Sequence, residues 1–210
     1  MSGNNENFTN ANGASYTRDN GGAISYDGAN DVTLSSTFYT GNYWQENGSW
    51  TIYSVHRIDI MNLTGGLFGN QKYTSETSPI GGFGLMLYGQ YKLYWILMSY
   101  DKDGTKSQYS WNTGRYYTPG QLDNIAFVYD ASSSSMKFYR NGSLSSSTTN
   151  ANFTWTPRSS GADCRIATSV QGGWENKMQG NINTMIIYNK ALSADEIAQN
   201  FNATRHRFGL

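Results

Sequence analysis

The sequence predicts an all-β fold, an antiparallel jelly-roll β-sandwich with one short C-terminal α-helix. Short runs of β-branched and aromatic residues recur about every ten residues, with turn residues between them. Dipeptides of the Asp-Gly and Asn-Gly type join some of these runs, and such dipeptides favour hairpins. The final run leads into a segment with the signals of a helix start. Together these observations favour a sandwich over alternating strands and helices.

Strands are expected where the β-branched and aromatic residues gather. The segment Leu93–Met98 is apolar at successive positions, so we expect it to be buried on both faces in the middle of a sheet. A further strand is expected close to the C-terminus. The other expected strands are residues 50–60, 82–88, 93–100, 124–130 and 136–139.

Turns and loops are expected between these strands. The dipeptides Asp27-Gly28, Asp103-Gly104 and Asn141-Gly142 predict hairpins, and the last is the clearest signal. The sequence shows neither a fixed-period repeat nor a second domain. Segments with few strand-forming residues are expected to be loops, and these are 37–49, 69–81, 111–121, 144–162 and 170–179.

Residues 180–197 predict a strand, a tight corner and a capped helix. Alternate residues of a strand point to the same face. The helix is expected to close off this last strand of the sheet. The face shared by period-two alternation is expected to carry Ile182, Thr184, Ile186 and Tyr188.

The helix signal begins at Ser193, a good N-cap. Glu196 three residues later completes a capping box, and Leu192 and Ile197 occupy the positions of a hydrophobic staple. Acidic residues in the first turn oppose the positive end of the helix dipole. Ile197 and Phe201 are four residues apart and predict the apolar stripe of the helix.

This ending resembles the C-terminus of laminin G-like domains of the concanavalin A-like lectin/glucanase superfamily, where the pattern is roughly G-x-I-D-x-V-x-I-Y-N-x-A-L-S-x-x-E-I. Segments 25–32, 49–55 and 127–142 are similar to upstream motifs of the family and follow in the same order. The resemblance covers about residues 23 to 202 and implies a concanavalin A-like sandwich. Its implication for function is weaker, because this superfamily hosts lectins, glycosidases, adhesion modules and virion proteins.

The composition narrows the function classes. Only 14% of the residues are charged, and 15 Lys and Arg balance 15 Asp and Glu, so no net field attracts nucleic acid or an anionic membrane. No apolar run approaches the length of a membrane span. Polar residues are mainly Asn, Ser, Thr, Gly and Tyr, and 15% of residues are aromatic. This composition is typical of glycan-binding faces and of protein surfaces that are packed into assemblies.

The chain divides into an N-terminal arm, residues 1–22, and a sandwich domain, residues 23–210. The arm is rich in Asn and Gly and almost free of large apolar residues. We expect it to be extended and to be held by a neighbouring subunit or another protein. The alternative is that it packs along its own domain as an edge strand. The start of the chain has no basic and apolar leader, so we expect a soluble protein that is made in a cytosol or exported without a Sec signal.

Catalytic motifs are missing from the sequence. Glucanases of this fold use an E-x-D-x-x-E strand, which has no counterpart here. The motifs G-x-S-x-G, H-E-x-x-H and C-x-x-C are likewise missing. Asp101 and Asp103 lie in a turn signal, and His56 is a lone histidine on a strand, where a packed or hydrogen-bonded role is expected. We therefore expect a protein that is not an enzyme.

Calcium is the one cofactor that the resemblance suggests, since many laminin G-like domains bind a Ca²⁺ ion at the sheet rim through oxygen ligands. Asn183 stands where the family commonly has Asp, which weakens any such site. The alternative for the acidic residues is turn chemistry, in which Asx side chains bond the local backbone. The matching positions are Asp27, Asn30, Asp31 and Asn183.

Sugar binding would need exposed aromatic rings that stack on sugar faces, with polar groups to fix hydroxyls. Loop aromatics are the place to look, because core rings are not accessible. Trp174 is the best single candidate, since glycines and polar residues flank it. The alternative is that such rings fold back onto their own sheet. The candidates are Tyr43, Trp44, Tyr116, Tyr117 and Trp174.

Two functional hypotheses remain open. The first is a non-enzymatic structural protein on the surface of a virion, such as a phage capsid decoration, fibre or tail-associated adhesin, that can also bind host glycans. It would be made in the host cytoplasm, and its arm, residues 1–22, would contact other virion proteins or copies of itself. The second is a carbohydrate-binding module of a larger glycosidase or adhesin. Both would use cell-surface polysaccharide as a partner.

Overall fold

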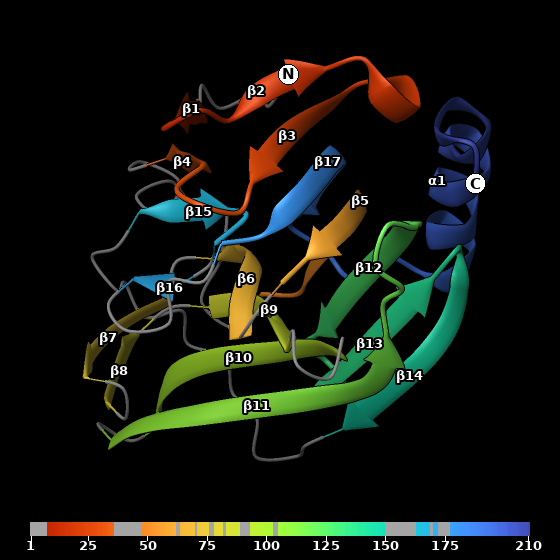
Figure 1. Ribbon diagram of the computed structural model, residues 1–210. Helices are drawn as coiled ribbons and strands as arrows, with labels where there is room; N and C mark the ends of the chain where they lie inside the picture. Colours follow the sequence, from red (N-terminus) through yellow and green to blue (C-terminus); the bar gives the residue numbers. More distant parts are fainter. Residues whose placement is uncertain are drawn as a thin grey trace.

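Two seven-stranded antiparallel sheets lie face to face in the computed structural model (Figure 1). A small three-stranded sheet lies at one end. The structure describes residues 8–35, 48–61, 64–69, 71–75, 78–81, 83–88, 93–102, 105–149, 163–168, 170–171 and 177–210. The predicted antiparallel sandwich is confirmed.

The strand orders define the sheets. Sheet A has the order β1 (Thr9–Ala11), β4 (Val32–Ser35), β15 (Cys164–Ile166), β6 (Thr64–Gly69), β9 (Phe83–Tyr88), β10 (Leu93–Lys102) and β11 (Thr105–Tyr116). Sheet B has the order β14 (Ser143–Thr149), β13 (Ser135–Arg140), β12 (Leu122–Asp130), β5 (Trp50–Ile60), β17 (Gln179–Tyr188), β3 (Ala23–Asp27) and β2 (Ser15–Thr17). The small sheet joins β16 (Val170–Gln171), β7 (Gln71–Ser75) and β8 (Ser78–Gly81).

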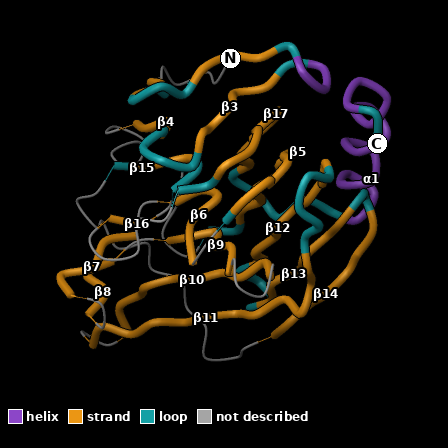
Figure 2. The backbone as a smooth tube through the Cα atoms, in the orientation of Figure 1, coloured by secondary structure: helices purple, strands orange, loops and turns teal. Residues whose placement is uncertain are grey.

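The central strands β12 and β5 of sheet B bury residues on both faces of the sheet. Along β5, Trp50, Ile52 and Ile58 point into the core between the sheets, while Tyr53 and Val55 point the other way. The outward residues pack in a second cluster under the helix α1 (Ala194–Phe208), which lies beside sheet B in Figure 2. The alternation of period two therefore feeds two hydrophobic clusters from one strand.

The predicted strands are confirmed to within two residues at their ends. β5 spans Trp50–Ile60 as predicted, and β9, β10, β12 and β13 cover the other expected segments. β10 has β9 on one side and β11 on the other, one position from the end of sheet A among the described strands.

Several segments expected to be loops are strands instead. β7 and β8 lie within residues 69–81 and pair with each other, β16 begins the segment 170–179, and residues 111–116 and 144–149 belong to β11 and β14. β14 is rich in Ser, and β11 mixes Ser, Asn, Gln, Lys and Gly with its Thr, Tyr and Trp residues, so neither segment shows an uninterrupted run of strand-forming residues. Each pairs along nearly its whole length with a strong neighbour, β10 or β13. Pairing across the sheet therefore overrides local preference.

Two of the three predicted hairpins are confirmed. Asn141 and Gly142 both have positive φ, at 50° and 77°, and they join the paired strands β13 and β14, as expected for a type I′ turn. β10 and β11 pair as far as Lys102 and Thr105, which confirms the second hairpin from its strands, whereas the turn residues Asp103 and Gly104 lie outside the described residues. The hairpin at Asp27-Gly28 is wrong, because β3 lies in sheet B and β4 in sheet A. The chain changes sheets at this corner.

A β-bulge changes the expected face of β17. Ile182 pairs with His56 and Thr184 with Val55, so Asn183 is an extra residue without a partner position. The bulge reverses the alternation after it. Ile182 therefore shares the inter-sheet core with Met185 and Ile187, which pack against it. The predicted common face of Ile182, Thr184, Ile186 and Tyr188 is wrong for this reason, and Ile186 is exposed.

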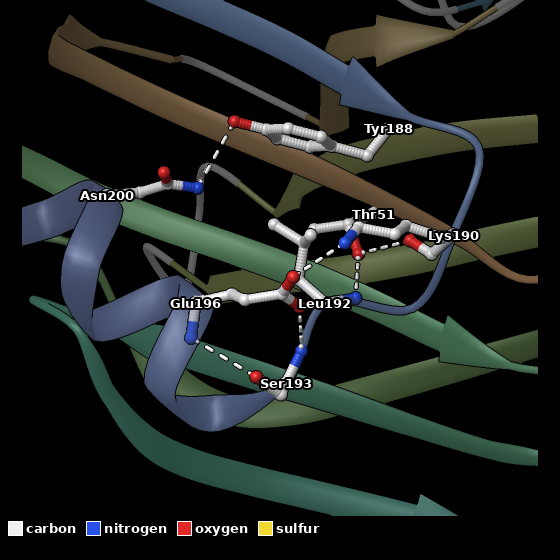
Figure 3. A network of polar contacts seen from close by, with 7 residues as sticks. All are labelled: Thr51, Tyr188, Lys190, Leu192, Ser193, Glu196 and Asn200. Carbon is white, nitrogen blue, oxygen red and sulfur yellow. Dashed lines mark hydrogen bonds and ion pairs between the residues drawn. The ribbon is translucent and has the colours of Figure 1, made fainter.

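The capped helix is confirmed. The backbone N–H of Glu196 donates to Ser193 Oγ at 3.2 Å, and the N–H of Ser193 donates to Glu196 Oε2 at 2.9 Å (Figure 3). Leu192 and Ile197 are both buried in the cluster under the helix, as the staple predicts. Thr51 of β5 donates to the Lys190 carbonyl at 2.9 Å and accepts the N–H of Leu192 at 3.0 Å, which fastens the corner to sheet B.

The described part of the N-terminal arm packs on its own domain. β1 pairs with β4 at an edge of sheet A, and β2 pairs with β3 at an edge of sheet B. The 3₁₀ turn η1 (Asp19–Gly21) reaches the C-terminal helix, where Arg207 donates to the Gly21 carbonyl at 3.0 Å. Residues 9–21 therefore take the edge-strand alternative, while a contact of the arm with another chain stays a prediction. Among the described helices, none is long and apolar enough to cross a membrane.

Candidate functional site

The candidate aromatic residues separate into three groups. Tyr43, Trp44 and Trp174 lie outside the described residues. Tyr116, at the end of β11, is 60% exposed. Tyr117 is only 4% exposed and packs edge-on against Tyr94, with ring centroids 5.9 Å apart. Tyr117 is therefore a core side chain, because successive residues at the end of this strand point to opposite sides, and the prediction that it presents a surface ring is wrong.

Two arginines hold the backbone around Tyr116. Arg140 of β13 donates from Nη1 to the Tyr116 carbonyl at 2.9 Å. Arg115 donates from Nε to the Ser145 carbonyl of β14 at 2.7 Å, and its Nη2 contacts the same oxygen. These bonds tie the end of β11 in sheet A to β13 and β14 in sheet B. The ring of Tyr116 is thus carried on a backbone that is fixed from both sheets.

We define the Tyr116 surface as the exposed residues near the end of β11, Asn112, Arg115 and Tyr116, together with the exposed Leu144 of β14. Leu144, beside Ser145, is 55% exposed. The surface combines an aromatic ring, an apolar side chain, a guanidinium group and an amide. Aromatic rings stack on apolar faces of sugars, while guanidinium and amide groups donate to hydroxyl and carboxylate oxygens.

The four candidate calcium ligands do not come together. Gln179 of β17 pairs with Asp27, so Asn183 lies four residues further along the strand, at about 13 Å for a rise of about 3.3 Å per residue. Asp27 Oδ1 accepts the backbone N–H groups of Ala29 and Asn30, and the first of these is the main reason that the pKa of Asp27 is lowered.

The other two candidates also serve the local turn. Asp31 Oδ2 accepts the backbone N–H of Asp27 at 2.8 Å, and the Asn30 carbonyl accepts from the Asn12 side chain at 3.3 Å. The side chains of Asp27 and Asp31 thus perform the turn chemistry that was the alternative interpretation, while Asn30 takes part through its backbone N–H and carbonyl. In the part of the chain that the structure describes, no three His, Cys, Asp or Glu residues are grouped to hold a metal ion. The donor set does not fit the predicted calcium site.

A polar chain crosses the core between the two sheets. His56 of β5 contacts the Tyr94 hydroxyl of β10 through Nε2 at 2.8 Å. The Tyr94 hydroxyl donates to Asp123 Oδ2 of β12 at 2.8 Å, and Arg140 Nε donates to Asp123 Oδ1 at 2.7 Å. On the other side, Ser54 Oγ lies 3.1 Å from His56 Nδ1. His56 was expected to be packed or hydrogen-bonded, and this is confirmed, whereas its partners Ser54 and Tyr94 were not foreseen.

The hydrogen bonds place the protons along this chain. The Tyr94 hydroxyl has one proton, which it donates to Asp123, so it must accept the proton of His56 Nε2. His56 is then neutral with Nδ1 unprotonated, and Nδ1 accepts the Ser54 hydroxyl. Burial lowers the pKa of His56 to about 4, and Arg140 adds to this, while Asp123 opposes it. Burial, followed by the charge of Asp123, raises the pKa of Tyr94 well above its usual value.

The same chain contains a Ser–His pair but is not an accessible catalytic site. Ser54, His56 and Tyr94 have no exposed surface at all. A nucleophile must reach the reacting carbon of its substrate, and this pair lies between two packed sheets. Its role is therefore to satisfy polar groups inside the core and to connect sheet A with sheet B.

An apolar pocket of about 240 Å³ lies between the sheets at the end near β1 and β3. Two of its polar side chains are engaged with protein groups: the Tyr26 hydroxyl bonds Thr33 Oγ1 at 2.8 Å, and Thr33 donates to Asn10 Oδ1 at 2.6 Å. Asn183, which also lines the pocket, uses its Nδ2 on two backbone carbonyls, and its Oδ1 has no protein partner. A sugar needs free donors and acceptors to orient its hydroxyls. The Tyr116 surface meets that need better. The lining residues include Phe8, Ile24, Phe68, Ile166, Ile182 and Ile187.

The comparison with protein families decides the family. The model of laminin G-like domains described as the concanavalin A-like lectin/glucanases superfamily matches residues 27–198. This chain belongs to that superfamily. The predicted concanavalin A-like fold is confirmed by this match and by the two facing sheets. No curated protein matches the chain.

Solved structures of binding domains are similar in fold to this superfamily member. The binding domain of Paraclostridial Mosquitocidal Protein 1 matches 97% of this chain at 15% identity and a TM-score of 0.71, and the match covers 48% of that domain. The CBM40 of the Ruminococcus gnavus IT-sialidase, bound to α2,3-sialyllactose, matches 73% of this chain and 83% of its own at 18% identity and a TM-score of 0.60. Domain 4 of the arabinanase AbnA from Geobacillus stearothermophilus, in complex with arabinotriose, matches 92% and 86% at 16% identity and a TM-score of 0.59.

These likenesses concern the fold. The chain spans about half the length of the mosquitocidal binding domain and more than four fifths of the two domains that come from glycosidases. This chain therefore has the architecture of a lectin-like domain.

Proposed function

We propose that this protein is a non-catalytic carbohydrate-binding domain that contacts its ligand through the Tyr116 surface. The observation that carries the proposal is the exposed ring of Tyr116 on a backbone fixed by Arg140 and, through Arg115, by β14. A rigid aromatic ring loses little conformational entropy when a sugar stacks on it. Membership of a lectin-like superfamily supports the proposal, as do similar domains whose structures hold sialyllactose and arabinotriose.

The class of sugar that we expect to bind follows from the polar side chains of the Tyr116 surface. Arg115 uses two of its nitrogens on the Ser145 carbonyl, and a guanidinium carries five donors, so further donors remain for a ligand. Asn112 is exposed three residues earlier on β11, although its Oδ1 already accepts the N–H of Gly114 at 2.8 Å. Donors outnumber free acceptors on this surface. It therefore favours sugars that present carboxylate or several hydroxyl oxygens next to an apolar ring face.

The substitution Tyr116→Ala is expected to weaken glycan binding at least about tenfold, since truncating a central aromatic contact costs about 1.4 kcal/mol or more. Retention on a glycan array measures this. The melting temperature should stay nearly unchanged, because the ring is exposed. Tyr16→Ala is the matched control: Tyr16 is 68% exposed on β2, at the opposite edge of sheet B from β14. Equal retention of both variants and the unchanged protein would eliminate the Tyr116 surface.

The proposal also states that the protein does not cleave the glycan that it binds, and this can be measured separately. Incubation with the retained glycan should release no reducing sugar, because the Ser–His pair of the described core is fully buried. Release of reducing sugar above background would instead identify an enzyme. A non-catalytic domain of this kind could serve as the carbohydrate-binding module of a larger glycosidase or adhesin.

A place on the surface of a virion, after synthesis in a host cytoplasm, is the second candidate. The observation in its favour is the edge of sheet B: β2 pairs only with β3 among the described strands and carries the exposed Tyr16. An open strand edge can pair with another chain. The substitution Tyr16→Asp should then shift the protein from an oligomer to a monomer in light scattering after size-exclusion chromatography. A monomer before the substitution would count against self-assembly through this edge.

A further inference from the structure

The side chain of Asn183 fastens the N-terminal segment to β17. Its Nδ2 donates to the Asn20 carbonyl at 2.8 Å and to the Gly22 carbonyl at 3.1 Å. Asn183 is the extra residue of the β17 bulge, so its side chain is released from the alternation of the strand. Asn20 has a φ of 48°, within the turn η1 (Asp19–Gly21). Two carbonyl oxygens thus converge on one amide nitrogen.

This arrangement needs positive charge or hydrogen-bond donors at its centre. The carbonyl oxygens of Asn20 and Gly22 would repel an oxygen placed between them. The NH₂ group of the Asn183 side chain instead supplies two N–H donors, one for each carbonyl. A carboxylate at position 183 would offer acceptors only. A hard divalent cation, which oxygen ligands surround, could then hold the three groups together. Asn183 Oδ1 is buried without a protein partner, so a second carboxylate oxygen at this place would also lack a donor.

We call the contact of the Asn183 amide with the carbonyls of Asn20 and Gly22 the latch. We propose that this amide takes the place that a divalent cation would occupy between a carboxylate and the two carbonyls, so that the latch forms without a metal ion. Asp27, which the calcium prediction grouped with Asn183, lies about 13 Å away along the strand, and the side chains of Asp27 and Asp31 bond their own turn. A single substitution, Asn183→Asp, should therefore convert the latch into one that requires a divalent cation.

The latch matters because it joins three separate parts of the chain. The Gly21 carbonyl of the same turn accepts from Arg207 of α1 at 3.0 Å. An added Cβ at Gly21 would lie 2.6 Å from the Arg207 carbonyl, so the turn and the helix are in close contact. The arm, the bulge of β17 and the end of the C-terminal helix are thus connected through η1. Loss of the latch should lower global stability.

The test compares melting temperatures in chelator and in millimolar CaCl₂ for the full chain and two variants. The unchanged protein should melt at the same temperature in both. N183D should melt about 4–8 °C lower in chelator, as expected for a loss of about two hydrogen bonds worth about 1 kcal/mol each in a domain of this size, and CaCl₂ should restore at least half of the loss. N183A should melt lower in both, without a response to calcium. Asn189→Asp, at an exposed position just after β17, controls for the added charge.

Each outcome decides the proposal. A melting temperature of the unchanged protein that rises with CaCl₂ would overturn it, because a metal would then already be part of the latch. N183D that keeps its stability in chelator, or that gains nothing from CaCl₂, would overturn it as well. If N183D folds only when calcium is present throughout purification, its folding depends fully on the cation, and this result supports the proposal. If it is unfolded with and without calcium while N183A folds, the cation site does not form and the proposal is wrong.

Discussion

Gly180→Ala is expected to destabilise the fold by about 4 kcal/mol or more, which is enough to prevent folding of a marginally stable domain. A Cβ at this position would lie 2.0 Å from the Arg57 carbonyl oxygen and 3.0 Å from its carbon. These atoms belong to the backbone of β5, which cannot rotate out of the way. Gly180 also has a φ of 151°, which L-residues with a side chain rarely adopt. The measurement is the free energy of unfolding in urea.

Gly114→Ala separates the clash from the backbone strain. Gly114 has a φ of 66°, but an added Cβ would have no atom within 4 Å. This variant should lose only about 1–2 kcal/mol, the cost of a positive φ alone. Similar losses for the two variants would contradict the close approach of β17 and β5 at Gly180. The backbones of β17 and β5 would then have to lie further apart at Gly180 than in the structure.

Acidification from pH 6.5 to pH 4 is expected to remove about 3 kcal/mol of stability through His56 alone. In the unfolded chain His56 binds a proton near its ordinary pKa of 6.5, whereas burial lowers the pKa to about 4 in the folded protein. The unfolded state therefore binds more protons between these values, and stability falls as the pH falls. Below pH 4 both states carry the proton and the loss is complete. Urea unfolding at closely spaced pH values measures this slope.

His56→Gln is the control for the pH experiment, because glutamine keeps a neutral N–H donor but does not titrate. This variant should be less stable at neutral pH, yet its stability should change less between pH 6.5 and pH 4. Carboxyl groups with a lowered pKa, such as Asp130 beside Ser132, lose their contribution only as the pH falls further. Parallel slopes for the variant and the unchanged protein would show that His56 does not titrate in this window.

Local signals in the sequence predicted the elements that depend on near neighbours. The capping box of Ser193 and Glu196, the strand Trp50–Ile60 and the turn at Asn141-Gly142 each rest on residues a few positions apart. β11 and β14 were missed because their stability comes from pairing with β10 and β13. The corner at Asp27-Gly28 looked like a hairpin, since the same turn residues serve both purposes. Which sheet a strand joins is not a local property.

The site residues show the same limit. An exposed Tyr116 and a buried Tyr117 are adjacent in the sequence, and only the end of β11 decides which one faces outward. The chain from His56 through Tyr94 and Asp123 to Arg140 joins residues from both sheets that are far apart in sequence. The extra residue in β17 is visible only from its pairing with β5. The lone His56 inside the expected strand 50–60 was a signal that could have pointed to a buried network, whereas Asp123 preceded the expected strand 124–130.

The central claim is that this lectin-like domain holds a glycan without changing it. The most direct measurement passes a panel of acidic and neutral oligosaccharides over the immobilised full chain and determines the masses of whatever is retained and then eluted. The account predicts that at least one oligosaccharide is retained and returns with its mass unaltered. Shortened products, or no retention anywhere in the panel, would contradict it.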